Sequence, residues 1–210
     1  EDSISLATID NLFYPQPHES NGSNNWAVHP SKTKEGYAIL CNDPHLGLSL
    51  PSIWYEIQLH GPGTNSYGVT LPGAPSVIIG FNENIAWGIT NSSRDVLDWY
   101  RIEFKDDSRK EYKYGDGYRP VEQVIEEIKL TDGSILYDTV LWTHHGPVVY
   151  DKNFQDPGSE RPINVAMHWA ALDPGLELMT FYLLNRAEDH ADYQEALQYF
   201  DCPGQNFAFA

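Results

Sequence analysis

The chain has 210 residues, enough for one domain or for part of a larger one. Its hydrophobic fraction of 41% and aromatic fraction of 13% are typical of a globular protein with a core and exclude a disordered chain. With 30 acidic and 13 basic residues the net charge is −17, which argues against nucleic-acid and anionic-membrane partners. We expect an acidic surface that keeps the protein soluble.

The sequence shows neither a membrane-spanning segment nor a signal peptide, and its cysteines do not identify a redox compartment. No run of about 18 apolar residues could span a membrane, and the first residues lack the basic start and apolar stretch of a signal peptide. The two cysteines, Cys41 and Cys202, lie far apart without a metal-binding spacing, and either a disulfide or two free thiols fits the pattern.

The first part of the chain changes from loop to strand signals. Residues 1–22 carry a short apolar patch and then a polar run from Pro15 to Gly22, which is typical of an exposed spacer. From Trp26 onward strand signals dominate. Residues 37–41 are a short apolar run, and residues 53–60 alternate between apolar and polar side chains, the pattern of a half-buried strand.

Two hairpins and two further strands are predicted in the middle of the chain. The turn residues Asn82-Glu83-Asn84 and Thr131-Asp132-Gly133 separate the hairpin strands. The predicted strands are residues 76–81, 85–90, 119–130, 134–142, 145–150 and 163–169.

The end of the chain is the part that is convincingly helical. Apolar residues share one helical face in two successive segments, and Asp189 is a plausible N-cap of the second. The faces are formed by Leu176, Met179, Leu183 and Leu184, and by Tyr193, Ala196, Leu197 and Phe200. Strands followed by paired helices predict a layered α+β fold. Residues 206–210 have the pattern of a strand cut in mid-course, which favours a piece of a longer protein.

The Gly22-Ser23 junction is the first candidate for chemistry, because it leads directly into a strand-like segment. If that peptide bond is cut, Ser23 carries both a hydroxyl and a free α-amine, a nucleophile with its own base. The dipeptide is common, and two other interpretations remain open: an ordinary loop serine, and a glycosylation sequon at Asn21-Gly22-Ser23.

Several sequence blocks occur in order and with matched spacing. The main blocks are residues 23–28 (SNNWAV), 42–48 (NDPHLGL) and 80–91 (GFNENIAWGITN), and the supporting ones are residues 71–75, 144–149 and 205–207. From about residue 15 to residue 210 they resemble the start of the β subunit in the penicillin acylase (penicillin amidase) family of N-terminal-nucleophile hydrolases.

The resemblance implies a precursor that cuts itself between Gly22 and Ser23. Residues 1–22 would be the end of the α subunit or a spacer, and residues 23–210 the incomplete N-terminal part of the β-subunit domain. The Ser23 hydroxyl would attack the Gly22 carbonyl, and an N→O acyl shift and ester hydrolysis would follow. Glycine permits a strained backbone at such a bond. The expected partners are the α subunit and the remainder of the β subunit.

The resemblance also implies roles in the mature enzyme. Ser23 would attack the carbonyl of a small-molecule acyl amide and form an acyl-enzyme. His45 would lie near the nucleophile and orient its amine, and the backbone N–H of Asn91 would be one oxyanion donor. The second donor would lie beyond residue 210, so these residues would not form a complete active site. Leu46 and Ile79 would line the acyl pocket, although either fits a core position equally well.

No organic cofactor is implied, but a structural calcium ion is. The segment 93–98 is similar to the family's calcium-binding part, with the carboxylates of Asp95 and Asp98 and the carbonyl of Leu97 as ligands. Three oxygens fall short of the roughly six to eight that calcium takes, and two solvated aspartates are the alternative. His144-His145 is not predicted to bind metal, because adjacent strand residues point to opposite faces.

The fold that the resemblance implies is α+β, a part of the αββα four-layer sandwich of these hydrolases, with two stacked antiparallel sheets and flanking helices. The expected function is hydrolysis of a linear amide bond in a penicillin or cephalosporin side chain, an N-acyl homoserine lactone or a similar compound. The resemblance favours a periplasmic or secreted location. Two alternatives stay open: an inactive relative that is not processed, and an acidic, calcium-stabilised, β-rich binding domain.

Overall fold

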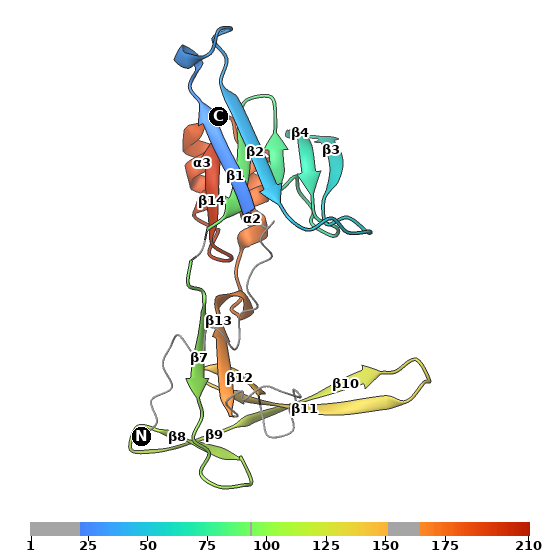
Figure 1. The fold of residues 1–210 in the computed structure, drawn as a ribbon, viewed down its shortest axis with the longest axis vertical. Helices are drawn as coiled ribbons and strands as arrows, with labels where there is room; N and C mark the ends of the chain where they lie inside the picture. Colours follow the sequence, from blue (N-terminus) through green and yellow to red (C-terminus); the bar gives the residue numbers. More distant parts are fainter. Residues whose placement is uncertain (1–21, 93, 151–163) are drawn as a thin grey trace. The chain divides into compact units, whose positions relative to one another are not determined.

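The computed structural model describes residues 22–92, 94–150 and 164–210 and divides them into two compact units (Figure 1). We call residues 22–96 with Asp173–Ala210 the ribbon unit, and Leu97–Leu172 the hairpin unit. Each is described by itself. Residues 1–21 of the predicted spacer, which include the sequon residue Asn21, lie outside the described residues, and the expected boundary between Gly22 and Ser23 stays a prediction.

A five-stranded antiparallel sheet forms the centre of the ribbon unit, with the strand order β14-β6-β5-β4-β3. The strands are β3 (Tyr55–Gly61), β4 (Thr64–Thr70), β5 (Ile79–Phe81), β6 (Ala86–Asn91) and β14 (Gln205–Phe209). The last strand of the chain thus lies beside a strand from its middle (Figure 1).

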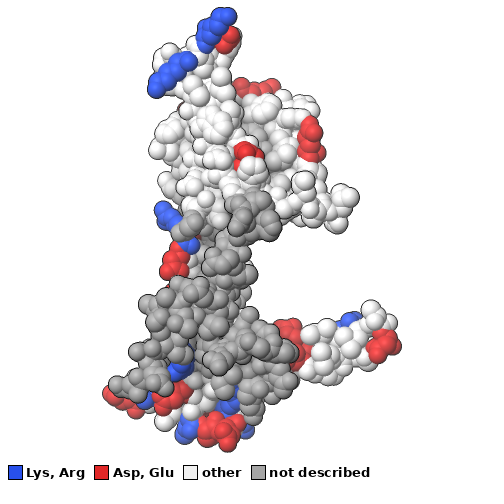
Figure 2. Space-filling view, in the orientation of Figure 1, with Lys and Arg blue, Asp and Glu red and all other residues white. Residues whose placement is uncertain are grey.

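A two-stranded antiparallel sheet, which we call the ribbon, consists of β1 (Gly22–Val28) and β2 (Ile39–His45). A short 3-10 turn, η1 (Pro30–Lys32), follows β1. Gly22 lies opposite His45, and Ser23 lies opposite Pro44. Most of the visible surface of the ribbon unit is neither acidic nor basic, so the negative charge of the chain is not concentrated on that face (Figure 2).

Two helices, α2 (Glu177–Leu184) and α3 (His190–Leu197), cover the face of the sheet away from the ribbon. Trp87 is fully buried in a core shared with Phe181 and Leu184 of α2, and its indole N–H donates to the carbonyl of Ile78. Gly88 faces Asn42 of the ribbon. Since neighbouring strand residues point to opposite faces, ribbon, sheet and helices form three successive layers.

The predicted N-cap of the last helix is confirmed. Asp189 Oδ1 accepts hydrogen bonds from the backbone N–H of Ala191 at 2.8 Å and of Asp192 at 3.0 Å. An acceptor at this position satisfies donors that the first turn of a helix leaves unpaired.

Because of Tyr193 in α3, the free energy of unfolding of the ribbon unit should fall at alkaline pH. The side chain is 5% exposed, and burial raises its pKa from 10.0 to about 12. The unfolded chain releases the Tyr193 hydroxyl proton near pH 10, whereas the folded chain retains it. The contribution of Tyr193 to the free energy of unfolding is therefore fully present below pH 10 and is lost as the pH rises toward 12. The expected loss is about 3 kcal/mol. Urea unfolding below and above pH 10 should show this loss in the wild-type protein and not in Tyr193→Phe; equal losses would contradict the assignment.

The hairpin unit contains a second five-stranded antiparallel sheet, in the order β10-β11-β12-β13-β7. Its strands are β7 (Leu97–Arg101), β10 (Glu122–Lys129), β11 (Ile135–Thr143), β12 (Gly146–Tyr150) and β13 (Val165–Trp169), and β8 (Glu111–Tyr114) pairs with β9 (Gly117–Pro120). His144 and His145 pack on tyrosines here: the Tyr112 hydroxyl lies 2.8 Å from His144 Nδ1, and His145 stacks on Tyr100.

The structure confirms both predicted hairpins, as β5–β6 and β10–β11, and both helices. It adds strands β4, β7 and β8, which the sequence pattern does not reveal, and it divides the predicted strand 119–130 between β9 and β10. Cys41 and Cys202 are free thiols. Among the helices of the described residues, none has the length and apolar character needed to cross a membrane.

Candidate active site

A cavity of about 390 Å³ in the ribbon unit brings together Ser23, Leu46 and Asn91, three of the residues singled out in the sequence. Its walls are mostly apolar and come from the ribbon, the sheet, α2 and the segment before β14. They include Ile53, Trp54, Ile78, Ile89, Phe181 and Phe200. A cavity of this size and character is typical of a small-molecule site.

The candidate nucleophile is the second residue of β1. Ser23 is half-buried and lies opposite Pro44 in the ribbon. The preceding Gly22 has no positive φ, and a Cβ there would meet nothing within 4 Å. The structure therefore shows no backbone strain at Gly22 and gives no steric reason for a glycine.

The backbone N–H of Asn91 is not used by the sheet. Asn91 lies opposite Gln205, and at the next rung the Ser92 N–H donates to the Gly204 carbonyl at 3.1 Å. Hydrogen-bonded and non-bonded pairs alternate in an antiparallel ladder, so the Asn91 N–H points away from β14. On its other side, β6 pairs with β5 only at its first two residues. The described ladders thus leave this N–H available beside the cavity.

Two of the five predicted catalytic and pocket residues, His45 and Ile79, do not line the cavity. His45 ends β2 opposite Gly22, with its side chain 57% exposed and its Nδ1 3.6 Å from Asp43 Oδ2. Ile79 is a core residue, 9% exposed, and its neighbour Ile78 lines the cavity instead. Adjacent side chains of an extended chain point to opposite sides, so Ile78 faces the cavity while the predicted Ile79 faces away from it.

Cys202 lines the same cavity and is 6% exposed. Burial, followed by the nearby carboxylates of Glu177 and Asp201, raises the pKa of its thiol. Because the thiolate is the reactive form of cysteine, Cys202 is not a competing nucleophile near neutral pH. Its place in the wall could not be read from the sequence, since it lies far along the chain from Ser23.

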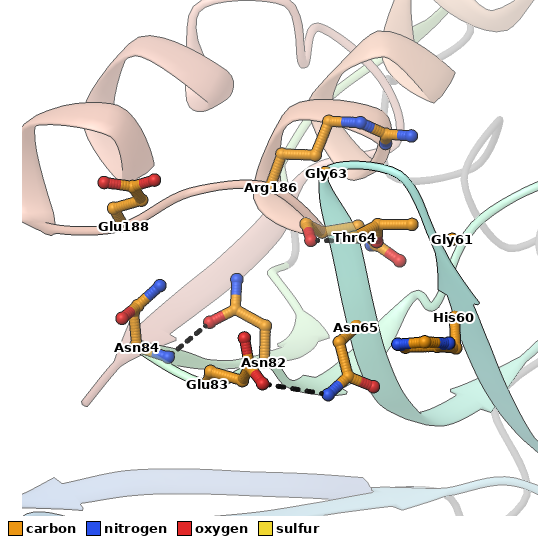
Figure 3. A pocket seen from close by; sticks show the side chains of 11 residues that line it. His60, Gly61, Gly63, Thr64, Asn65, Asn82, Glu83, Asn84, Arg186 and Glu188 are labelled. Atoms are coloured by element: carbon orange, nitrogen blue, oxygen red, sulfur yellow. Dashed lines mark hydrogen bonds between the residues drawn. The ribbon is translucent and has the colours of Figure 1, made fainter.

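A second cavity of the ribbon unit, about 270 Å³ in volume, is polar (Figure 3). Its side chains bond to one another and to the backbone: Asn65 Nδ2 donates to Glu83 Oε1 at 3.1 Å, and Thr64 Oγ1 donates to the Asn185 carbonyl at 3.2 Å. Asn82 Oδ1 accepts from the backbone of the turn that follows it. These polar groups hold the hairpin turns against the end of α2, and their role is therefore structural.

The candidate calcium ligands lie around the start of β7. Asp95 belongs to the ribbon unit, whereas Leu97 and Asp98 are the first residues of β7 in the hairpin unit. Within the described part of the chain, no group of three or more His, Cys, Asp or Glu side chains could hold a metal ion. Ser93 of the same segment lies outside the described residues. The calcium site therefore stays a prediction.

Comparison with known proteins identifies the family of the chain. The family model for penicillin amidase matches residues 2–210. The acyl-homoserine lactone acylase QuiP of Pseudomonas aeruginosa is 33% identical over 60% of this chain and 15% of its own length. QuiP of Pseudomonas fluorescens strain Pf0-1 is 26% identical over 91% of the chain and 23% of its length. The penicillin acylase 2 proenzyme of Pseudomonas sp. strain SE83 is 32% identical over 61% and 16%.

Among solved structures, a thermostable penicillin G acylase from Alcaligenes faecalis matches with a TM-score of 0.74 and 26% identity, over 89% of this chain and 33% of that one. This likeness confirms the expected fold class, antiparallel sheets with few flanking helices. The chain spans less than a quarter of the length of the curated relatives just described. With a family model that matches almost every residue, the chain belongs to the penicillin amidase family.

Proposed function

We propose that the full-length protein hydrolyses a linear amide bond in an N-acylated small molecule, with Ser23 as an N-terminal nucleophile freed by cleavage after Gly22. The observation that carries the proposal is the shared cavity: Ser23 and Asn91, whose N–H the described ladders leave unused, border one apolar space. The names of the relatives, acyl-homoserine lactone acylase and penicillin acylase, support an acyl amide as the substrate class.

The reaction follows from the groups at the cavity. The Ser23 hydroxyl attacks the amide carbonyl, its proton passes to the Ser23 α-amine, and the Asn91 N–H donates to the developing oxyanion. The C–N bond then breaks, the departing amine takes up the proton, and water hydrolyses the remaining ester to the free acid. A free α-amine has an ordinary pKa near 8, so part of it is unprotonated at neutral pH. Before cleavage this nitrogen is an amide and cannot act as a base.

We assign His45 the role of orienting the α-amine that cleavage would create at Ser23. It lies opposite Gly22 in the ribbon, beside the bond to be cut, and cleavage would leave its ring near the α-amine of Ser23. The second oxyanion donor is proposed to come from residues after 210. The α subunit and the rest of the β subunit would be the partners that complete the site.

The cavity favours an apolar acyl group. Leu46 and Ile78 form part of its wall, and Ile79 supports the wall from the core. An apolar acyl chain gains free energy by leaving water, whereas an anionic one would lose hydration and meet the carboxylate of Glu177 in the wall. We propose in addition that Asp95, Asp98 and the carbonyl of Leu97 contribute to a structural calcium site, and that the protein is exported.

The test uses the full-length protein with an N-acyl homoserine lactone and with penicillin G, and measures release of the primary amine. Intact-mass analysis and N-terminal sequencing should find a chain that begins at Ser23, and brief incubation should add the mass of the acyl group to that chain. The free amine products without their acyl groups serve as controls. A protein that is folded and uncut, and that releases no amine, would refute the proposal and favour an unprocessed relative.

A further inference from the structure

Two asparagines at one rung of the ribbon reach across to the five-stranded sheet. Asn25 of β1 lies directly opposite Asn42 of β2, and directly opposed side chains of an antiparallel pair share one face. Asn42 Nδ2 donates to the carbonyl oxygen of Ile89 in β6 at 3.1 Å. Asn25 Nδ2 donates to the carbonyl oxygen of Asn206 in β14 at 3.2 Å. This rung therefore ties the ribbon to two adjacent strands of the sheet.

The same rung lies close to both reacting groups. Ser23 precedes Asn25 by two residues, so their side chains point to the same face of the ribbon. Ile89 precedes Asn91 by two residues in β6, and Asn206 Nδ2 donates to the Asn91 carbonyl at 3.2 Å. The separation of the Ser23 hydroxyl and the Asn91 N–H is therefore set by how the ribbon docks on the sheet.

Gly88 of β6 determines how closely Asn42 can approach. A Cβ on Gly88 would overlap Asn42 Oδ1 and lie 2.9 Å from Asn42 Cγ, closer than side chains pack. Gly88 has no positive φ, so space rather than conformational freedom accounts for the glycine. Asn42 Oδ1 is buried without a hydrogen-bond partner among the described residues. A Gly88 Cα hydrogen faces it in place of a side chain, as a weak C–H···O contact.

We propose that Asn42 is a positioning residue, which acts with Gly88 as a clasp that fixes the distance between the Ser23 hydroxyl and the Asn91 N–H. The inference rests on the proposed function. Catalytic groups must be held within about 0.5 Å of their productive geometry, and a displacement of about 1 Å costs roughly 100-fold in rate. Asn42 binds Ile89, two residues from Asn91, and it shares a rung with Asn25, two residues from Ser23. This docking contact therefore controls that distance directly, for self-cleavage as well as for substrate hydrolysis.

The test compares Gly88→Ala, Asn42→Ala and the double variant in the full-length protein. Gly88→Ala should slow self-cleavage and kcat by about 100-fold because the ribbon is pushed away from the sheet. Asn42→Ala, which loses the bond to Ile89 and the Oδ1 contact with Gly88, should lower kcat by about tenfold with KM changed by less than about twofold. The double variant removes the overlapping amide, so its kcat should recover by about tenfold over Gly88→Ala. Recovery is partial because Asn42 Cβ would still lie 3.0 Å from the new methyl group.

Gly61→Ala is the matched control, because a Cβ on that strand glycine meets nothing within 4 Å. Melting temperature is measured for every variant. A clasp with a merely structural role would lower the melting temperature while kcat per processed molecule stayed at the wild-type value, and that result would overturn the inference. A double variant no better than Gly88→Ala would overturn it as well. A wild-type protein without cleavage or hydrolysis would instead refute the proposed function.

Discussion

Ser23→Ala in the full-length protein is expected to leave the chain uncut after Gly22 and to reduce amide hydrolysis by about 10⁴-fold or more. One oxygen atom is removed from a half-buried residue, so the ribbon should dock as before. In the proposed mechanism the hydroxyl is the group that attacks the Gly22 carbonyl, and without cleavage the α-amine proposed as the base never forms. The single substitution therefore removes the nucleophile and the base together.

Two further variants separate this effect from a folding defect. Ser23→Cys retains a nucleophile of similar size and should still be cut, with slower hydrolysis of the substrate. Ser31→Ala removes a hydroxyl from the exposed turn after β1 and should be processed like the wild type. Intact mass after timed expression and amine release by the purified proteins are the measurements. Cleavage of Ser23→Ala after Gly22 at the wild-type rate would show that another group performs the reaction.

Features whose signals are local could be predicted from the sequence. The turn Thr131-Asp132-Gly133 does join two paired strands, and Asp189 does cap α3, because a turn or a cap depends on a few neighbouring residues. The sequence does not predict strand β4, because Gly68 interrupts it and its alternation of apolar and polar residues is weak. Gly68 is needed there, since a Cβ would overlap the Ile79 carbonyl oxygen of the neighbouring strand. Pairing on both sides of β4 overrides its low strand propensity.

For the candidate site as well, the sequence predicts individual residues but not the packing around them. Family resemblance named Ser23 and Asn91, and the structure places both at one cavity. The walls supplied by Phe181 and Phe200 depend on how α2 and α3 pack on the sheet, which no local pattern encodes. The choice between Ile78 and Ile79 depends on which side of an extended chain faces the cavity, and a shift of one residue reverses it. Long-range packing therefore decides the shape of the pocket, and with it the acyl group that fits.

Asn185→Ala should destabilise the ribbon unit by about 3 to 5 kcal/mol. Asn185 is 2% exposed at the end of α2. Its Nδ2 donates to the carbonyls of Val77 at 2.9 Å and Phe181 at 2.7 Å, and its Oδ1 accepts from the Val77 N–H at 3.0 Å. Truncation would leave both backbone groups of Val77 buried without these partners, and an unpaired buried group costs more than a hydrogen bond contributes when it is made.

Unfolding of the full-length protein in urea, with Asn84→Ala as the control, measures this loss. Asn84 lies on the exposed turn of the β5–β6 hairpin, and its truncation should change stability by less than about 0.5 kcal/mol. Asn185→Asp should be no milder than Asn185→Ala, because a carboxylate would face two carbonyl oxygens that now receive hydrogen bonds. Equal stability of Asn185→Ala and Asn84→Ala would contradict the prediction. Since Phe181 also lines the Ser23 cavity, the same amide that anchors α2 fixes one wall of the site, and variants at Asn185 should weaken substrate binding before the protein unfolds.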